Sequence, residues 1–190
     1  MRMPADPQDL SAVQRCLRGE TAVFSELLGR YKLRVFSYLL RVVRNPSDAE
    51  DLAQETFLKA YSKLGSYDPA HPFLTWLFRI AHNCAVDLLR RRRPEEFSLE
   101  DEEEPLETAD PAADPERRAE SASTRESVDH ALAGLPAPYR EALILRHREG
   151  LDYRSMAGVL GVPEGTVKIR IFRGRDLLRK RLSEMGLAGA

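Results

Sequence analysis

The chain has 190 residues, which suffices for one domain or two small ones, and its hydrophobic content is ordinary for a folded protein. No apolar run approaches the roughly 20 residues that a membrane span needs, and the first residues lack the apolar core of a signal peptide, so we expect a cytoplasmic protein without membrane insertion. The net charge is −1, but acidic and basic residues are concentrated in different segments of the chain. Residues 94–124 hold twelve acidic and two basic side chains, a balance of −10, which leaves +9 for the rest of the chain.

Apolar residues at helical spacing run through residues 9–93. A short helix is predicted from Asp9 to Arg18, and a longer one from about Glu20 to Arg44. The core stripe of the longer helix is expected to contain Phe24, Leu27, Leu28, Tyr31, Val35, Leu39 and Val42.

The Asn45-Pro46 pair ends this long helix. Ser47, with Glu50 three residues later, predicts a capping box at the start of the next helix. That helix is expected to end at about Leu64. Its buried stripe is predicted to consist of Ala49, Ala53, Phe57, Ala60, Tyr61 and Leu64.

The loop sequence GSYDPAHP leads to a last helix of this part, from about Phe73 to Arg93. Residues 94–124 follow and are rich in Pro, Glu, Asp and Ala, with only three large apolar residues. Such a segment cannot bury enough apolar surface to offset the entropy that is lost on ordering. We therefore predict a flexible acidic linker.

A second helical domain is predicted at residues 125–185. Asp152 is the expected N-cap of the first helix of a helix-turn-helix, and Gly161 suits the left-handed conformation that ends it. Pro163 suits the first position of the second helix. Two further helices are expected ahead of this motif, at 125–133 and 138–148.

The second helix of the motif is strongly basic. Residues 165–181 contain seven Lys or Arg against one Asp. A helix-turn-helix places such a second helix in the DNA major groove. An ordinary helical hairpin with a solvated basic face is the alternative. The core stripe of the helix is predicted to be Val167, Ile171, Gly174, Leu178 and Leu182.

The sequence thus predicts an all-α fold of two small helical domains, 9–93 and 125–185, joined by a flexible acidic linker at 94–124, with the helix-turn-helix in the C-terminal domain. Cys16 and Cys84 lie far apart without metal-ligand spacing, so we expect core thiols rather than a disulfide or a zinc site. No nucleophile, base or metal cluster stands out, and we expect neither enzymatic activity nor a cofactor or metal.

Two sequence blocks, in this order, resemble a known family. The first domain contains DAEDLAQETFLKAY followed by FLTWLFRIAHNCAVDLLRRRR, and the second contains LPAPYREALILRHREGLDYRSMAGVLGVPEGTVKIRIFRGRDLLRKRL. Together they resemble bacterial sigma factors of the two-domain extracytoplasmic-function (ECF) type over most of residues 19–182, apart from the linker. The resemblance implies a promoter-specificity subunit that binds core RNA polymerase, recognises the −35 and −10 promoter elements and helps to start DNA melting and transcription.

In this family, the capped helix of the first domain docks on the clamp of the largest polymerase subunit. The matching polar residues here, one turn apart on one face, are Asp51, Gln54, Glu55 and Lys59. A solvated face with a Glu-Lys pair is the alternative. The resemblance also implies that the helix at 138–148 helps to form the groove for the flap tip of the second-largest subunit, although its apolar residues are also consistent with a plain core.

The loop and last helix of the first domain would, by the same resemblance, capture the unpaired −10 strand. Aromatic rings can stack on bases, an Asn amide can bond a base edge, and arginines can contact phosphates. The alternative is that Trp76 and most of these aromatic residues lie in the core, which for Trp76 is equally consistent with the sequence. For the arginine run the alternative is compensation of the helix dipole. The implied −10 residues are Phe73, Trp76, Phe78, Arg79, Asn83, Arg90, Arg91 and Arg92.

In the second domain, the resemblance assigns −35 recognition to the exposed face of the last helix. Arg173 is the strongest candidate for a bidentate contact to guanine, and Phe172 for contact with a thymine methyl. Ile169 departs from the small polar residue common there, and Gly174 from the usual Ala, which lowers helix propensity by up to about 1 kcal/mol. The implied −35 residues are Thr166, Lys168, Ile169, Arg170, Phe172, Arg173 and Arg175.

The implied partners are core RNA polymerase, promoter DNA and an anti-sigma factor. One competing hypothesis is a stand-alone helix-turn-helix transcriptional regulator, which would bind a palindrome without polymerase and should have a short or neutral linker. Another is a nucleic-acid enzyme such as a nuclease, which would need carboxylates or histidines beside its basic face. The carboxylates of this chain gather in the linker instead.

Overall fold

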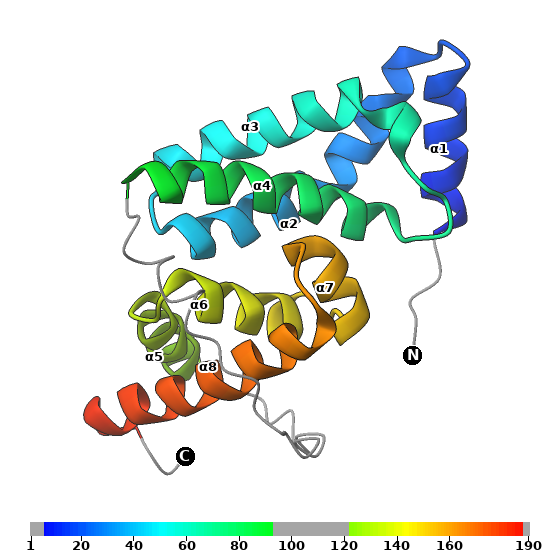
Figure 1. Cartoon of the computed structure of the whole chain (residues 1–190). Helices are drawn as coiled ribbons and strands as arrows, with labels where there is room; N and C mark the ends of the chain where they lie inside the picture. The colour runs from blue at the N-terminus through cyan, green and yellow to red at the C-terminus, as the bar shows by residue number, and fades with distance from the viewer. Residues whose placement is uncertain (1–5, 93–121, 188–190) are drawn as a thin grey trace. The chain divides into compact units, whose positions relative to one another are not determined.

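The computed structural model describes residues 6–92 and 122–187, and every regular element in these two stretches is a helix (Figure 1). The predicted all-α class is confirmed. No helix within these stretches is long and apolar enough to cross a membrane. In chain order the elements are α1 (Pro7–Leu17), the 3₁₀ turn η1 (Thr21–Val23), α2 (Phe24–Val43), α3 (Pro46–Ser62), the 3₁₀ turn η2 (Leu64–Ser66), α4 (Phe73–Arg92), α5 (Ala122–Ala133), α6 (Ala137–Leu143), the π-helical turn η5 (Ile144–Arg148), α7 (Tyr153–Leu160) and α8 (Glu164–Glu184).

Contacts between these helices divide the chain into two compact units. The first contains α1 to α4, and the second contains α5, α6, η5, α8 and the greater part of α7. Two separate helical units agree with the predicted two-domain fold. The predicted linker at 94–124 lies outside the described residues except for its last three residues, which belong to α5.

In the first unit, α2, α3 and α4 pack against one another, and α1 packs on α2 and on the two 3₁₀ turns (Figure 1). Two residues that were predicted to be buried are exposed instead. Leu28 and Tyr61 are 38% and 45% exposed because they lie at the edges of their stripes, although the Tyr61 ring still meets the Phe24 ring at 5.1 Å. The apolar residues of this unit with no exposed surface are Leu27, Val35, Tyr38, Leu39, Ala49, Ala60, Phe73, Leu77, Phe78, Ala81 and Ala85.

The start of α3 differs from the prediction. The Asn45 side chain accepts a hydrogen bond from the Asp48 N–H at 3.0 Å, and Pro46 occupies the first turn. An Asn cap followed by Pro satisfies the start of the helix two residues before Ser47. The predicted capping box at Ser47 is therefore wrong.

α1 is anchored to α2 through a buried carboxylate. The helix begins at Pro7, capped by Asp6, so the expected start at Asp9 is corrected. Asp9 is only 2% exposed and accepts hydrogen bonds from the Tyr31 hydroxyl and the Arg30 guanidinium. Burial, and then the Asp9 carboxylate, raises the pKa of Tyr31 well above its ordinary value, so its hydroxyl stays a donor.

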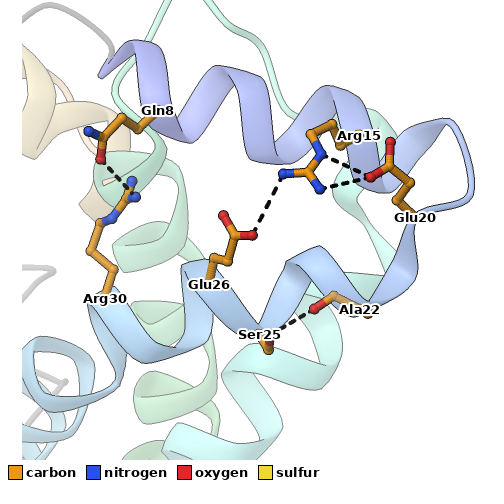
Figure 2. A network of polar contacts seen from close by, with 7 residues as sticks. All are labelled: Gln8, Arg15, Glu20, Ala22, Ser25, Glu26 and Arg30. Carbon is orange, nitrogen blue, oxygen red and sulfur yellow. Dashed lines mark hydrogen bonds and ion pairs between the residues drawn. The ribbon is translucent and has the colours of Figure 1, made fainter.

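Exposed polar contacts also link α1 to η1 and α2 (Figure 2). Arg15 pairs with Glu20 at 2.8 Å and lies 3.7 Å from Glu26, and Arg30 also donates to Gln8 at 3.1 Å. Exposed ion pairs contribute little because water and salt screen them. The buried Asp9 and the buried apolar residues Ala12, Val13 and Cys16 therefore hold α1 in place more than these exposed pairs do.

Cys16 and Cys84 are buried and form no disulfide, as predicted. Burial raises the pKa of each thiol above its ordinary value. Lys59 Nζ lies 3.5 Å from the Cys84 sulfur. Within the described residues, no group of three or more His, Cys, Asp or Glu is placed to hold a metal ion.

In the second unit, α8 packs on α6 and also contacts α5. The single helix expected at 138–148 is split, because α6 ends at Leu143 and continues as the π-helical turn η5. In that turn the Glu149 N–H donates to the Ile144 carbonyl at 3.1 Å. Leu143, Ile144 and Leu145 are all buried, which confirms the core interpretation of these three residues.

Gly174 lies where α8 approaches α6 most closely. A Cβ placed on Gly174 would lie 3.2 Å from Leu143 Cγ and 3.3 Å from the carbonyl oxygen of Tyr139. The missing side chain lets the two helices pack closely, which compensates for the lower helix propensity of glycine.

We predict that Gly174→Val destabilises the second unit by about 1–3 kcal/mol, because the added methyl groups must displace Leu143 or the α6 backbone. Gly165→Val is the matched control, since a Cβ at Gly165 of the same helix meets nothing within 4 Å. Guanidinium unfolding followed by circular dichroism measures both variants. Equal unfolding midpoints would contradict the packing role of Gly174.

Candidate nucleic-acid interface

The turn between α7 and α8 has the predicted geometry. Asp152 Oδ1 accepts a hydrogen bond from the Ser155 N–H at 2.8 Å and so caps α7. Gly161 adopts φ +67°, the left-handed conformation that ends the helix. Pro163 is the N-cap of α8, one position earlier than expected, and its carbonyl accepts from the Val167 N–H at 3.2 Å. Caps and turn together form a helix-turn-helix.

The side chains of α8 that were predicted to face DNA differ in exposure. Ile169 and Arg170 are only 7% and 4% exposed, so the expectation that these two side chains are offered to DNA is corrected. Arg170 follows the core stripe beside Ile171, and water disfavours an exposed Ile side chain. Phe172 is 49% exposed, and the remaining predicted residues are half-buried: Thr166, Lys168, Arg173 and Arg175.

Two basic side chains flank Tyr153 at the start of α7. The Arg146 guanidinium carbon lies 4.8 Å from the centre of the Tyr153 ring, and Lys168 Nζ lies 5.9 Å from it. Arg146 also donates to the Leu151 carbonyl at 3.0 Å. Sequence reasoning missed Tyr153 and Arg146, because their contact depends on the π-helical turn, which no residue spacing predicted.

In the first unit, exposed side chains form a stripe along α4. Arg79, Asn83 and Arg90 are exposed and share one face of the helix, and the half-buried Trp76 lies one turn before Arg79. From Trp76 to Arg90 the stripe extends about 21 Å at the helical rise per residue. The structure thus brings four of the predicted −10 residues together.

Phe73 and Phe78 are fully buried, so the prediction that they offer free aromatic planes to DNA is wrong. Burying a large aromatic ring is strongly favourable, and these rings lie inside the first unit. Trp76 lies at the edge of this packing and keeps part of its surface exposed. The ring centre of Phe73 lies 5.4 to 5.8 Å from those of Tyr31, Tyr67 and Trp76.

The arginines at the end of α4 are exposed, but two of them have partners within the unit. Arg91 Nε donates to the Asp87 carbonyl at 2.8 Å, and Arg92 pairs with the Asp48 carboxylate. The Arg92 side chain is 56% exposed. The Asp48 side chain is only 16% exposed, so release of Arg92 to another anion would leave a largely buried carboxylate without this partner.

The predicted polymerase-binding residues share one face of α3. Asp51, Gln54 and Glu55 are exposed, and Lys59 is half-buried. Lys59 pairs with Glu55 at 2.7 Å, so the Glu-Lys pair of the alternative interpretation is also present.

Sequence reasoning missed Leu58, which is 72% exposed. At about 100° per residue, Leu58 lies between Gln54 and Glu55 on the helical wheel. A single exposed apolar side chain is common on protein surfaces, so Leu58 is of interest only because it lies within the face that was predicted to bind polymerase. The same periodicity, applied to the sequence, identifies this position.

One unit contains a helix-turn-helix with basic and aromatic side chains on its second helix, and the other is a separate helical unit with a polar and basic stripe. Together they define a two-domain, all-helical DNA-binding protein. Each of the two units matches a known protein family. The family described as Sigma-70 region 2 matches residues 27–95, and that described as Sigma-70, region 4 matches residues 125–178.

Similar proteins cover nearly the whole chain. It is 32% identical over 181 residues to the ECF RNA polymerase sigma factor SigW of Bacillus subtilis, covering 91% of this chain and 96% of that protein. It is 35% identical over 189 residues to the RNA polymerase sigma-H factor of Pseudomonas aeruginosa, covering 96% and 98%. The chain belongs to the ECF sigma factor family, and it is a promoter-specificity subunit of RNA polymerase.

Solved structures agree with this family. CnrH in complex with the cytosolic domain of CnrY has a TM-score of 0.67 and 26% identity, covering 93% of this chain and 98% of that one. The sigma factor RpoE in complex with the anti-sigma factor NepR from Bartonella quintana has a TM-score of 0.64 and 27% identity, covering 84% and 96%.

We predict that Asp152→Ala destabilises the second unit by about 1 kcal/mol at neutral pH, because α7 loses its cap. Burial alone would raise the pKa of Asp152, but hydrogen bonds from Ser155 and the nearby Arg146 lower it overall. The folded pKa is then below the unfolded one. The stabilisation is full above about pH 4 and is lost as the pH falls through the folded pKa.

Guanidinium unfolding at pH 7 and pH 3 measures this effect, and the difference between wild type and Asp152→Ala should shrink at the lower pH. Asp152→Asn is the control, because its amide oxygen still caps the helix without a charge. A difference that is the same at both pH values would show that the carboxylate does not stabilise the cap.

Proposed function

We propose that the first unit binds core RNA polymerase through α3 and captures the non-template strand of the −10 element with α4 and the loop before it, while α8 recognises the −35 element. The proposal is carried by one observation: exposed or half-buried polar, basic and aromatic side chains lie on three helix faces at positions that the family resemblance assigns to these tasks.

A pull-down with core polymerase, followed by run-off transcription on a genomic library, tests the proposal. We expect the chain to bind polymerase and to start transcripts at promoters that share two sequence elements. Absence of polymerase binding, together with nanomolar binding of a palindrome by the chain alone, would favour the stand-alone regulator.

The α3 face suits a partner helix that carries arginines. Asp51 and Glu55 supply carboxylates for charge-assisted hydrogen bonds, and Leu58 supplies an apolar centre among them. We assign this face to the clamp of the largest polymerase subunit. The role of the α6 region at the flap tip of the second-largest subunit stays a prediction, since its three central apolar residues are buried in the chain.

We predict that Leu58→Ala weakens binding to core polymerase by about 1–2 kcal/mol, roughly fivefold to thirtyfold, because the centre of the interface loses its apolar contact. Leu33→Ala is the matched control, since Leu33 on α2 is 70% exposed against 72% for Leu58. Competition binding with labelled chain measures both variants. An equal loss in both, or none in Leu58→Ala, would argue against α3 as the docking face.

Capture of the −10 strand rests on the stripe along α4. Stacking of one unpaired base on an aromatic ring is worth about 1–3 kcal/mol, and duplex stacking averages about 1.4 kcal/mol per step. Because Phe73 and Phe78 are buried, Trp76 is the ring of the predicted set that remains for stacking. Trp76 with Asn83 can hold one or two extruded bases, so the polymerase must supply the rest of the opening.

Recognition by two small units requires a common platform, because each unit contacts only a few base pairs. Binding of both units to one polymerase makes the second DNA contact intramolecular, with a high effective concentration. Residues 94–124 carry ten more negative than positive charges. This net negative charge repels DNA phosphates and disfavours tight DNA binding by the isolated chain. By family resemblance, we assign this segment to the path of template DNA and RNA in the polymerase.

We predict that Arg173→Ala reduces discrimination at one −35 base pair by about 1–3 kcal/mol, because a bidentate contact to guanine is lost. Arg179→Ala is the control for charge alone, since Arg179 lies near the end of the same helix with its side chain 77% exposed. Holoenzyme binding to −35 duplexes with single base changes measures both. An unaltered base preference in Arg173→Ala would remove Arg173 from direct base recognition.

We also propose that the chain has no catalytic activity of its own, acts in the cytoplasm and is held inactive by an anti-sigma factor. Two of the similar solved structures are complexes, one with the cytosolic domain of CnrY and one with the anti-sigma factor NepR, which supports an inhibitor of this kind. Co-purification of the tagged chain from its own cells, under uninduced conditions, tests for that inhibitor.

A further inference from the structure

The loop between η2 and α4, residues 67–72, is ordered by hydrogen bonds of its own. The Ala70 N–H donates to Asp68 Oδ1 at 2.9 Å, and the His71 N–H donates to the Asp68 carbonyl oxygen at 3.1 Å. The Asp68 and His71 side chains lie 3.1 Å apart and are 62% and 54% exposed. The loop therefore presents two polar side chains to solvent on a defined backbone.

Tyr67 connects the two ends of this loop. Its hydroxyl donates to the His71 carbonyl oxygen at 2.6 Å. Its ring is 8% exposed and lies 5.4 Å from the Phe73 ring and 5.5 Å from the Trp76 ring, both in the first turn of α4. Burial raises the pKa of Tyr67 to about 12, so the hydroxyl is a protonated donor at neutral pH.

The contacts that hold the Tyr67 ring in place continue as far as α1. Phe73 also contacts Tyr31 of α2, with ring centres 5.8 Å apart, and the Tyr31 hydroxyl donates to the buried Asp9. The rings and the buried carboxylate form one continuous support. The Tyr67 ring is therefore fixed, and its hydroxyl is aimed at the far end of the loop.

We propose that the Tyr67 hydroxyl is a positioning group for −10 recognition: its bond to the His71 carbonyl keeps Asp68 and His71 in the conformation that meets an unpaired base. This inference rests on the proposed role of the first unit at the −10 element. A loop that is ordered before DNA arrives loses less conformational freedom on binding. Loss of the bond should weaken capture of unpaired DNA while the fold persists.

The test compares Tyr67→Phe with wild type in holoenzyme assembled from core polymerase and the full chain. Run-off transcription with the wild type first defines the preferred −10 sequence. Binding is then measured to promoter DNA whose −10 non-template strand is unpaired, with each base replaced in turn. Tyr61→Phe is the matched control, because it removes the same hydroxyl from a tyrosine of the same unit that is 45% exposed.

We expect Tyr67→Phe to reduce the preference for the best base by about threefold to tenfold. Its polymerase affinity, its −35 duplex affinity and its melting temperature should match wild type, and Tyr61→Phe should keep the full preference. An unchanged preference in Tyr67→Phe would overturn the inference. So would parallel losses in polymerase affinity or melting temperature, which indicate a purely structural role.

Failure of the proposed function itself is distinguishable from failure of this inference. If wild-type holoenzyme shows no base preference in the unpaired strand, the assignment of the first unit to the −10 element fails before any variant is measured. If wild type shows the preference and Tyr67→Phe retains it, only the positioning role fails.

Discussion

Phe73 begins α4 and lies at the centre of a group of rings from α2, from the loop before α4 and from α4 itself. Its burial closes the core of the first unit, and it also fixes the position from which the exposed stripe of α4 starts. The same contact explains why Trp76, at the edge of the group, keeps one side open. The stability of this unit and its proposed role in DNA recognition therefore depend on the same packing.

A comparable constraint operates in the second unit, where Gly174 allows α8 to lie close against α6. The opposite side of α8 carries Phe172 and Arg173, so the depth of packing on one side sets how far these side chains project on the other. Gly161 sets the angle at which α8 leaves the turn. Two glycines, for different reasons, thus define how the exposed side of α8 is presented.

The sequence predicted what depends on local chemistry. Periodicity, caps and turn residues located every helix in the described stretches to within a few residues, and Asp152 and Gly161 have the predicted roles. Predictions from the sequence failed where tertiary packing determines whether a side chain is buried or exposed. A phenylalanine suits stacking on a base as well as it suits a core, and only the folded unit shows that Phe73 is enclosed.

The errors at individual positions have similar physical causes. Asn45 was expected only to end the preceding helix, but its side chain caps α3 because Pro46 suits the first turn of a helix. The Arg146 guanidinium packs on the Tyr153 ring from within a π-helical turn, and no pattern in the sequence predicted that turn. The exposed position of Leu58, in contrast, could have been predicted from the sequence, because the helical periodicity that placed its polar neighbours on one face of α3 places Leu58 there too.

The two native thiols have a practical consequence. Both are enclosed, and burial keeps them protonated, so a maleimide dye at neutral pH should react slowly with Cys16 and Cys84. Cysteines introduced as Leu33→Cys and Met185→Cys, at exposed positions in the two units, would then be labelled selectively without prior removal of the native ones. Energy transfer between such dyes would report the separation of the units in the free chain and in the assembled transcription machinery.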